Sequence, residues 1–234
     1  MRGVGFMRFH YPIAVAFVIP ALVCAACGAP PAEAPAIEPK ATAAPTAPPS
    51  GATGPLVVFL GDSLTAGYGL SESQAFPALI GERLRMKGIA ARVVNAGVSG
   101  DTSAGGLRRL DWVLRQRPDV LVVGLGANDA LRGQSVEEIE RNLREIVRRA
   151  RSAESVVVLL GMRIPTNYGD DYAEAFAALY PRLAKSESVA LVPFLLEGVA
   201  GRDDLNLADG IHPNSRGQQI VAATVEPWVR RALR

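Results

Sequence analysis

The stretch Leu56-Val57-Val58-Phe59-Leu60 (LVVFL) is an unbroken run of apolar residues, the pattern of a strand buried on both faces of a sheet. Similar runs follow at 91–94, 120–123, 156–160 and 189–192. Segments with helical periodicity accompany them, at about 74–87, 102–116, 135–152, 171–185 and 215–233. Because strand and helix alternate along the chain, we expect an α/β fold in which helices cover both faces of a parallel sheet. One domain over 56–234 is large enough for a single core.

The first 27 residues have the composition of an export signal. A basic start precedes an uncharged run over 11–26, which is shorter than the roughly 20 apolar residues of a membrane span. The stretch 22–28 (LVCAACG) resembles a bacterial lipobox, in which the cysteine, here Cys27, is acylated; Cys24 stands where that pattern prefers leucine. We expect residues 1–27 to be a lipoprotein signal peptide lipidated at Cys27. A soluble exported protein and an uncleaved anchor are the alternatives.

A linker separates this signal from the domain. Residues 28–55 contain 8 Pro and 9 Ala in 28 positions and almost no large apolar side chain. Such a segment cannot bury enough surface to offset the entropy of ordering it. We expect an extended Pro/Ala-rich linker, up to about 80 Å long if it is wholly polyproline-like.

Charge and residue inventory exclude several kinds of chemistry. The 25 basic residues outnumber the 23 acidic ones only by Arg2 and Arg8 of the leader, so nothing in the charge of the remaining chain favours nucleic acid. Both cysteines and one of the two histidines also precede residue 28. The domain therefore has no disulfide, thiolate nucleophile or cysteine metal site, and His212 is its only imidazole. The sequence indicates no metal and no organic cofactor.

Polar clusters lie where a parallel sheet binds its ligands, beyond the carboxyl ends of the strands. Three follow predicted strands, at 61–64 (GDSL), 95–101 (NAGVSGD) and 124–129 (GLGAND), and a fourth, 209–214 (DGIHPN), precedes the last helix. Each alone has a plain structural explanation. Ser63 suits a turn or a helix cap, and 124–129 is a poor dinucleotide loop because its third glycine is replaced by aspartate.

The combination points to nucleophilic catalysis. A serine hydroxyl such as that of Ser63 needs a base within hydrogen-bond reach, and imidazole, with an ordinary pKa of about 6.5, suits this role. The imidazole of His212 needs a carboxylate such as that of Asp209 to fix its tautomer. The tetrahedral intermediate needs donors for its oxyanion, which the N–H of Gly100, the carboxamide of Asn128 and the N–H of Ser63 can supply.

These blocks, in this order, resemble the GDSL or SGNH hydrolase family over essentially all of 56–234. The similarity is greatest to the bacterial thioesterase I/lysophospholipase and arylesterase branch, which 162–169 (MRIPTNYG), 180–184 (YPRLA) and 192–194 (VPF) also resemble. The resemblance implies the SGNH hydrolase fold, a three-layer α/β/α arrangement with a five-stranded parallel, flavodoxin-like sheet.

The resemblance also implies the roles of individual residues. By resemblance, Ser63 is the nucleophile, His212 is the base and Asp209 is the acid that orients the base. The resemblance also implies that the oxyanion hole consists of the N–H of Ser63 together with Gly100 and Asn128.

Two points stay open. Gly97 competes for the oxyanion-hole glycine, although Gly100 aligns better with the family pattern. By resemblance, Ile164, Pro165 and Tyr168 flank an acyl pocket, but turn chemistry alone explains this proline-containing loop equally well.

The implied reaction is transfer of an acyl group to water through an acyl-Ser63 intermediate. The implied substrates are carboxylic esters and thioesters, including aryl esters, short-to-medium acyl esters and lysophospholipids. Two alternatives remain: deacetylation of cell-wall or exported polysaccharide, and a non-catalytic binding lipoprotein. We expect an exported monomer that acts on small molecules and is held through a lipid anchor, facing the periplasm or the exterior; otherwise it is soluble in the periplasm or secreted.

The arginine-rich helix predicted at 135–152 has an ordinary explanation. Glu137, Glu140 and Glu145 each stand four residues before an arginine, the favourable order for ion pairs along a helix. We expect a solvated, self-paired face rather than a site for an anionic partner.

Overall fold

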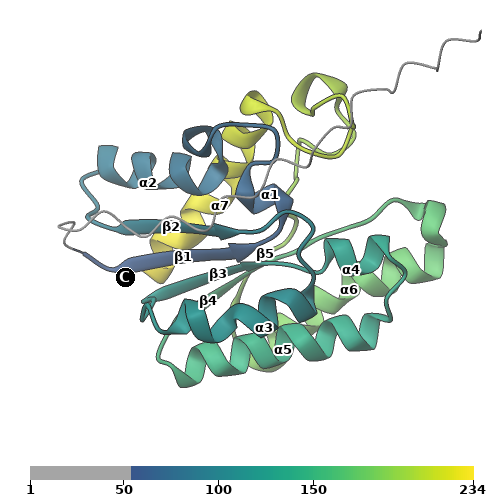
Figure 1. Ribbon diagram of the computed structural model, residues 1–234, viewed down its shortest axis with the longest axis horizontal. Coiled ribbons are helices and arrows are strands. Elements are labelled where there is room, and N and C mark those ends of the chain that lie inside the picture. Colours follow the sequence, from purple (N-terminus) through teal and green to yellow (C-terminus); the bar gives the residue numbers. More distant parts are fainter. Residues whose placement is uncertain (1–53) are drawn as a thin grey trace, which may run out of the picture. The chain divides into compact units, whose positions relative to one another are not determined.

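A computed structural model of the chain describes residues 54–234. Its sheet has five strands, all parallel, in the order β2-β1-β3-β4-β5 (Figure 1). The strands are β1 (Leu56–Gly61), β2 (Arg92–Gly97), β3 (Val120–Gly124), β4 (Val156–Leu160) and β5 (Ala190–Val192). This order is that of flavodoxin-like sheets. The α/β fold expected from the sequence is therefore confirmed.

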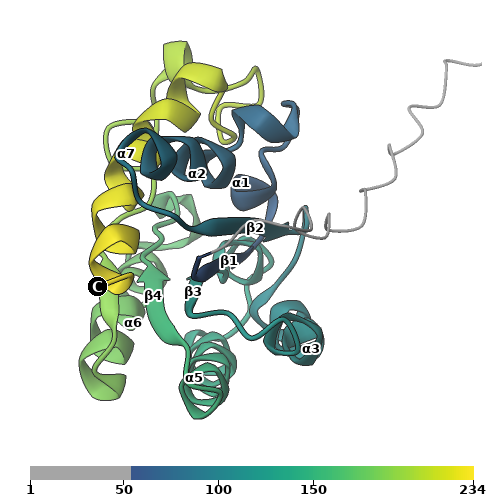
Figure 2. The same cartoon turned by 90° about the vertical axis from the view of Figure 1, so that its left-hand side faces the viewer.

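Helices lie on both faces of the sheet. They are α1 (Ser63–Ala66), α2 (Phe76–Met86), α3 (Ser103–Leu114), α4 (Ala127–Leu131), α5 (Val136–Ser152), α6 (Asp170–Glu187) and α7 (Ser215–Ala232). Helices α2 and α7 pack together on one face, and α3 and α6 flank α5 on the other, which gives three layers (Figures 1 and 2). Three single-turn 3₁₀ helices, at Glu72–Gln74, Thr166–Tyr168 and Asp203–Leu205, interrupt the loops.

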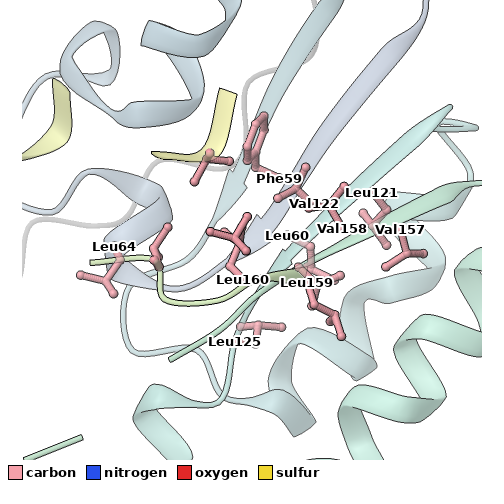
Figure 3. Packing of buried hydrophobic residues seen from close by; sticks show 14 of the residues in the cluster. Phe59, Leu60, Leu64, Leu121, Val122, Leu125, Val157, Val158, Leu159 and Leu160 are labelled. Carbon is pink, nitrogen blue, oxygen red and sulfur yellow. The ribbon is translucent and has the colours of Figure 1, made fainter. Parts of the chain in front are cut away.

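The core lies on both sides of the central strands. Phe59 and Leu60 of β1, and Leu121 and Val122 of β3, have no exposed surface, as the unbroken apolar runs predict (Figure 3). The ring of Phe59 meets that of Phe76 edge to face at 5.5 Å, which ties β1 to α2. Burying one such side chain stabilises the fold by about 1.5–3 kcal/mol.

Glycines end the three adjacent strands at the same level. Gly61 pairs in register with Gly97 on one side and with Gly124 on the other. A Cβ on Gly97 would lie only 2.3 Å from the backbone nitrogen of Ala66. The missing side chain therefore lets α1 lie directly against the end of β2, which places the first turn of α1 at this edge of the sheet.

The residues before 54 lie outside the described part of the chain. The predicted signal peptide at 1–27, with Cys27, and all but the last two residues of the linker at 28–55 fall there. Within residues 54–234, no helix is both long and apolar enough to cross a membrane.

Candidate active site

The end of β1 presents Ser63 at the start of a short helix. Asp62 is the N-cap of α1, and its carboxylate accepts a hydrogen bond from the Leu64 N–H at 3.0 Å. This cap fixes the turn between β1 and α1. Ser63, the first residue of the helix, is partly exposed, whereas Asp62 is buried.

A long loop between β5 and α7 brings the histidine to the same place. Asn206 and Pro213 form an antiparallel bridge, and the Leu207 N–H donates to the His212 carbonyl at 2.7 Å. Between them Gly210 takes a φ of 74°, which glycine adopts at little cost. The loop is thereby folded into a tight turn with His212 on its returning arm.

Three side chains form a continuous hydrogen-bonded chain. His212 Nε2 lies 2.9 Å from Ser63 Oγ, and His212 Nδ1 lies 2.8 Å from Asp209 Oδ2. The other oxygen of Asp209 accepts from the backbone N–H groups of Ile211 and His212 at 3.0 and 2.9 Å. Although partial burial opposes it, these bonds and the imidazole lower the pKa of Asp209, so its carboxylate is ionised at neutral pH.

Asn128 and Gly100 lie beside Ser63. Asn128 is the second residue of α4, and its Nδ2 donates to the Asp101 carbonyl at 3.0 Å and lies 3.4 Å from Asp62 Oδ2. Gly100 has a φ of 79° and lines the same hollow as Ser63 and Asn128. Gly97 does not line that hollow, because it packs against the backbone of α1.

Asp62 is a buried acid that the sequence did not single out. Burial raises its pKa to about 7; the bond from Leu64 opposes this rise, while the neighbouring carboxylates of Asp101 and Asp129 add to it. The Asp of the GDSL block therefore titrates near neutrality, although it lies next to the partly exposed serine. No sequence pattern signals this, since it depends on what covers the side chain.

Arg109 of α3 ties the strand ends together beneath the site. Its guanidinium donates to the carbonyls of Ala96 at 2.6 Å and Gly61 at 2.9 Å, and it pairs with Asp101 at 2.7 Å. One side chain thus links the ends of β1 and β2 to the loop that carries Gly100. We infer that it sets the spacing between Ser63 and this loop.

A hollow of about 500 Å³ opens next to Ser63, Asn128 and His212. Its walls are mainly apolar and include the side chains of Leu64, Leu131, Met162, Ile164, Pro165, Phe194, Leu196 and Ile211. Of the three residues expected to flank an acyl pocket, Ile164 and Pro165 line it. Tyr168 lies in the exposed 3₁₀ turn before α6 and is not part of the wall.

Tyr68 is a further component that sequence reasoning missed. It is half-exposed, lines the hollow, and its ring lies over that of His212, with the centroids 4.5 Å apart and the planes at 35°. The only available signal was its place five residues after Ser63. The contact itself joins segments separated by more than 140 residues, so spacing could not reveal it.

Known proteins with this sequence pattern share the fold. Residues 59–220 match the model of the GDSL-like lipase/acylhydrolase family. The chain is 44% identical to esterase TesA of Pseudomonas aeruginosa over 178 residues, which cover 76% of this chain and 89% of that protein. It is 43% identical to thioesterase 1/protease 1/lysophospholipase L1 of Escherichia coli K12, with 76% and 82% covered.

The structures agree with the sequences. The crystal structure of TesA superposes with a TM-score of 0.74 at 44% identity, covering 76% of this chain and 99% of that one. The family match extends over more than half of this chain and includes the Ser63 and His212 blocks. The chain therefore belongs to the GDSL-like lipase/acylhydrolase family and is an SGNH hydrolase.

Proposed function

We propose that the protein is a serine esterase and thioesterase that hydrolyses carboxylic esters and thioesters through an acyl-enzyme on Ser63. The observation that carries this proposal is the unbroken hydrogen-bonded chain from Ser63 through His212 to Asp209, beside a mainly apolar hollow. A hydroxyl, a base and an orienting carboxylate in this order are the parts that acyl transfer to water requires.

In the first half-reaction, Ser63 Oγ attacks the carbonyl carbon as His212 Nε2 takes the hydroxyl proton. The tetrahedral intermediate places a negative charge on the former carbonyl oxygen. We assign the donors for that oxygen to the N–H groups of Ser63 and Gly100 and to Asn128 Nδ2. Asn128 is supported in this role by its bond to the Asp101 carbonyl, which orients the amide; its longer contact with Asp62 Oδ2, at 3.4 Å, is the one that an oxyanion would replace.

The first half-reaction ends when the proton on His212 passes to the leaving alcohol or thiol, and the acyl group stays on Ser63. In the second half-reaction, water gives a proton to His212 and attacks the acyl carbonyl; collapse of this intermediate returns the proton to Ser63 and releases the carboxylic acid. Asp209 remains ionised throughout, because its carboxylate stabilises the imidazolium that forms in both halves.

The shape of the site favours an acyl chain over a bare acetyl group. The hollow is lined mainly by carbon, and apolar side chains gain most from covering an alkyl chain. We assign Ile164 and Pro165 to the wall that contacts this chain, since both line the hollow. Aryl esters, short-to-medium acyl esters and lysophospholipids are the substrate classes that fit.

The test is a series of p-nitrophenyl esters: acetate, butyrate, octanoate and palmitate. We expect kcat/KM to peak at butyrate or octanoate. A rate confined to acetate would contradict the acyl-chain assignment and support a deacetylase. No turnover by the folded protein would support a non-catalytic binding function.

We also propose that the enzyme is exported as a lipoprotein, with Cys27 acylated and residues 28–55 as a spacer. The lipobox-like stretch at 22–28 and the Pro/Ala-rich composition support this. Expression with a radiolabelled fatty acid should label the wild type but not Cys27→Ser. Equal labelling of both proteins would contradict lipidation at Cys27.

A further inference from the structure

The two ends of the sheet carry opposite charge. We define the amino pole as the last turns of α2, α3, α5, α6 and α7 and the residues after each, at 83–91, 111–119, 149–155, 184–189 and 229–234. The carboxyl pole comprises the strand-to-helix connections with the first turns of the helices that follow, at 62–79, 98–106, 125–139, 161–173 and 193–218. The amino pole has eleven Lys or Arg and four Asp or Glu, and the carboxyl pole has four and twelve.

Helix dipoles explain why positively charged residues are found at the end of each helix, but not why these charges form one basic surface. Cations stabilise the last turn of a helix, which gives Arg151 or Arg231 a local reason to be there. All five long helices end at this pole, however, so their cations add up to one basic surface with a field of its own.

Much of this positive charge is unpaired. Five arginines at the amino pole are exposed and make no ion pair within residues 54–234: Arg115, Arg117, Arg151, Arg231 and Arg234. Along helix α5, Arg144 in the middle forms ion pairs, whereas Arg151 in the last turn forms none with the described residues. Arg144 pairs with Glu140 as the sequence predicts, whereas Arg149 pairs with Asp111 of α3, not with Glu145. The expectation of a self-paired face thus holds for Glu140, but it does not extend to Arg151 in the last turn.

A hollow at this pole combines cations with apolar surface. It has a volume of about 480 Å³ and is lined by two arginines and one acid, Arg151, Arg231 and Glu154, and by apolar side chains that include Val156 and Trp228. Val156 is half-exposed, and the Arg231 guanidinium lies over the Trp228 ring, 5.4 Å from its centroid. Arginine beside tryptophan and exposed aliphatic carbon suits a lipid headgroup region, where phosphates lie above hydrocarbon.

The linker joins the domain at the same pole. The Arg92 N–H donates to the Pro55 carbonyl, and Arg92 Nε donates to the Gly54 carbonyl, so the described chain enters at the amino end of β1 and β2. Figure 1 draws the C-terminus at this end of the strands, and Figure 2 looks at the molecule from this side. An anchor that precedes Gly54 in the chain therefore connects to the basic pole.

We propose that the amino pole docks on an anionic phospholipid surface, with headgroup phosphates at Arg151 and Arg231 and the Trp228 ring at headgroup level. Charge complementarity, the hollow and the entry point of the linker support this occupant. The hollow beside Ser63 is then on the opposite end of the sheet and stays open to substrate while the pole is docked.

Vesicle co-sedimentation of the full chain tests the proposal, with phosphatidylcholine vesicles and with the same vesicles containing phosphatidylglycerol. We compare wild type with Arg151→Gln/Arg231→Gln. The matched control is Arg108→Gln/Arg141→Gln, which removes two exposed, unpaired arginines from outside both poles. All of these proteins, the reference included, carry Cys27→Ser and Ser63→Ala, so neither the proposed acyl anchor nor hydrolysis of the vesicle lipids contributes, and differences between them report the domain.

We expect tighter binding to the phosphatidylglycerol vesicles, weakened by salt. At low salt, Arg151→Gln/Arg231→Gln should weaken binding about 30-fold, and the control should change it less than about threefold. Circular dichroism checks folding, and Arg115→Gln/Arg117→Gln serves as a second pole variant if the first fails to fold. Equal binding to neutral and anionic vesicles, or equal loss in pole and control variants, would overturn the proposal.

Discussion

The two poles of the sheet differ in construction as well as in charge. At the carboxyl pole, 14 residues separate β1 from α2, including the short helix α1, and 22 separate β5 from α7; these connections carry Ser63, Asp209 and His212. At the amino pole, 5 residues join α3 to β3 and 2 join α6 to β5. Long loops on a rigid sheet can bring distant side chains together, whereas short ones only reverse the chain.

The difference shows how one fold separates two tasks. Polar side chains at the carboxyl pole are held by specific partners, as Asn128 is by Asp101 and His212 is by Asp209. Several arginines at the amino pole have no ion-pair partner within residues 54–234 and act as a charged surface. Substitutions at the carboxyl pole should change catalysis, in some cases together with stability, whereas substitutions at the amino pole should leave catalysis unchanged and affect stability or association.

The largest effect should come from Ser63. Ser63→Ala should lower kcat for p-nitrophenyl butyrate by about 10⁵–10⁶-fold, because it removes the nucleophile without disturbing buried packing. Its counterpart at the amino pole is Ser155→Ala, which should leave kcat unchanged. A Ser63→Ala protein that retained half of the wild-type rate would refute the assignment of the nucleophile.

Because of Asp62, the free energy of unfolding of the protein should depend on pH. Burial raises its folded-state pKa to about 7, above an unfolded value of about 4. Its contribution to stability is therefore full below pH about 4 and is lost as the pH rises through 7, a change of roughly 4 kcal/mol. Asp209, whose folded-state pKa is lowered, contributes in the opposite sense: its stabilisation is lost only as the pH falls through that pKa.

Urea unfolding between pH 4 and 8 measures how the free energy of unfolding declines as Asp62 ionises. Asp62→Asn should flatten the decline in the free energy of unfolding, since the amide does not titrate but can still accept from Leu64. An unchanged slope in Asp62→Asn would show that this acid does not titrate in the window.

Asn128 tests the oxyanion hole. Asn128→Ala should lower kcat by about 10²–10³-fold with little change in KM, because its bond to substrate strengthens as the oxyanion forms. Steady-state kinetics with p-nitrophenyl butyrate separates the two parameters. An effect confined to KM would make Asn128 a substrate contact instead.

Arg109 should stabilise the protein by holding together the strand ends beneath the carboxyl pole. Arg109→Leu removes bonds to two strand-end carbonyls and to Asp101, and should lower the free energy of unfolding by about 2–4 kcal/mol. Its neighbour Arg108 is exposed, so Arg108→Leu should change stability by less than about 0.5 kcal/mol. Equal midpoints of urea unfolding in the two variants would contradict the scaffold role.

The smallest effect should be the loss of stability in Ser155→Ala, the amino-pole counterpart of Ser63→Ala. Ser155 is buried, and its hydroxyl donates to the Pro118 carbonyl at 2.6 Å. Ser155→Ala should cost about 1 kcal/mol in urea unfolding while kcat stays at the wild-type value. A large loss of kcat in this variant would break the separation between the two poles.

Most of the architecture could be predicted because its signals are local. Apolar runs marked the strands and helical periodicity marked the long helices, each within a few residues of its observed ends. Strand β2 runs to Gly97, beyond the expected 91–94, because Asn95 interrupts the apolar run while the strand continues, with Val94 and Ala96 buried on one face. Helices α1 and α4 span 4 and 5 residues, too few for a periodic pattern.

The site was predictable where residue types are scarce. A domain with a single histidine left only His212 as an imidazole base, and the family resemblance supplied the order of the remaining roles. The burial of Asp62 and the ring of Tyr68 over His212 depend on which distant segments meet, which spacing along the chain does not encode. The signal peptide at 1–27, Cys27 and the linker at 28–55 stay predictions.

Covalent trapping of the nucleophile tests the central claim most directly. An alkyl fluorophosphonate transfers its phosphonyl group to an activated serine, and intact-mass and peptide mass spectrometry then count and locate the adduct. We expect one adduct per chain, on Ser63, absent in Ser63→Ala and formed far more slowly in His212→Ala. An adduct on another residue, or full esterase activity in a protein with no adduct, would contradict it.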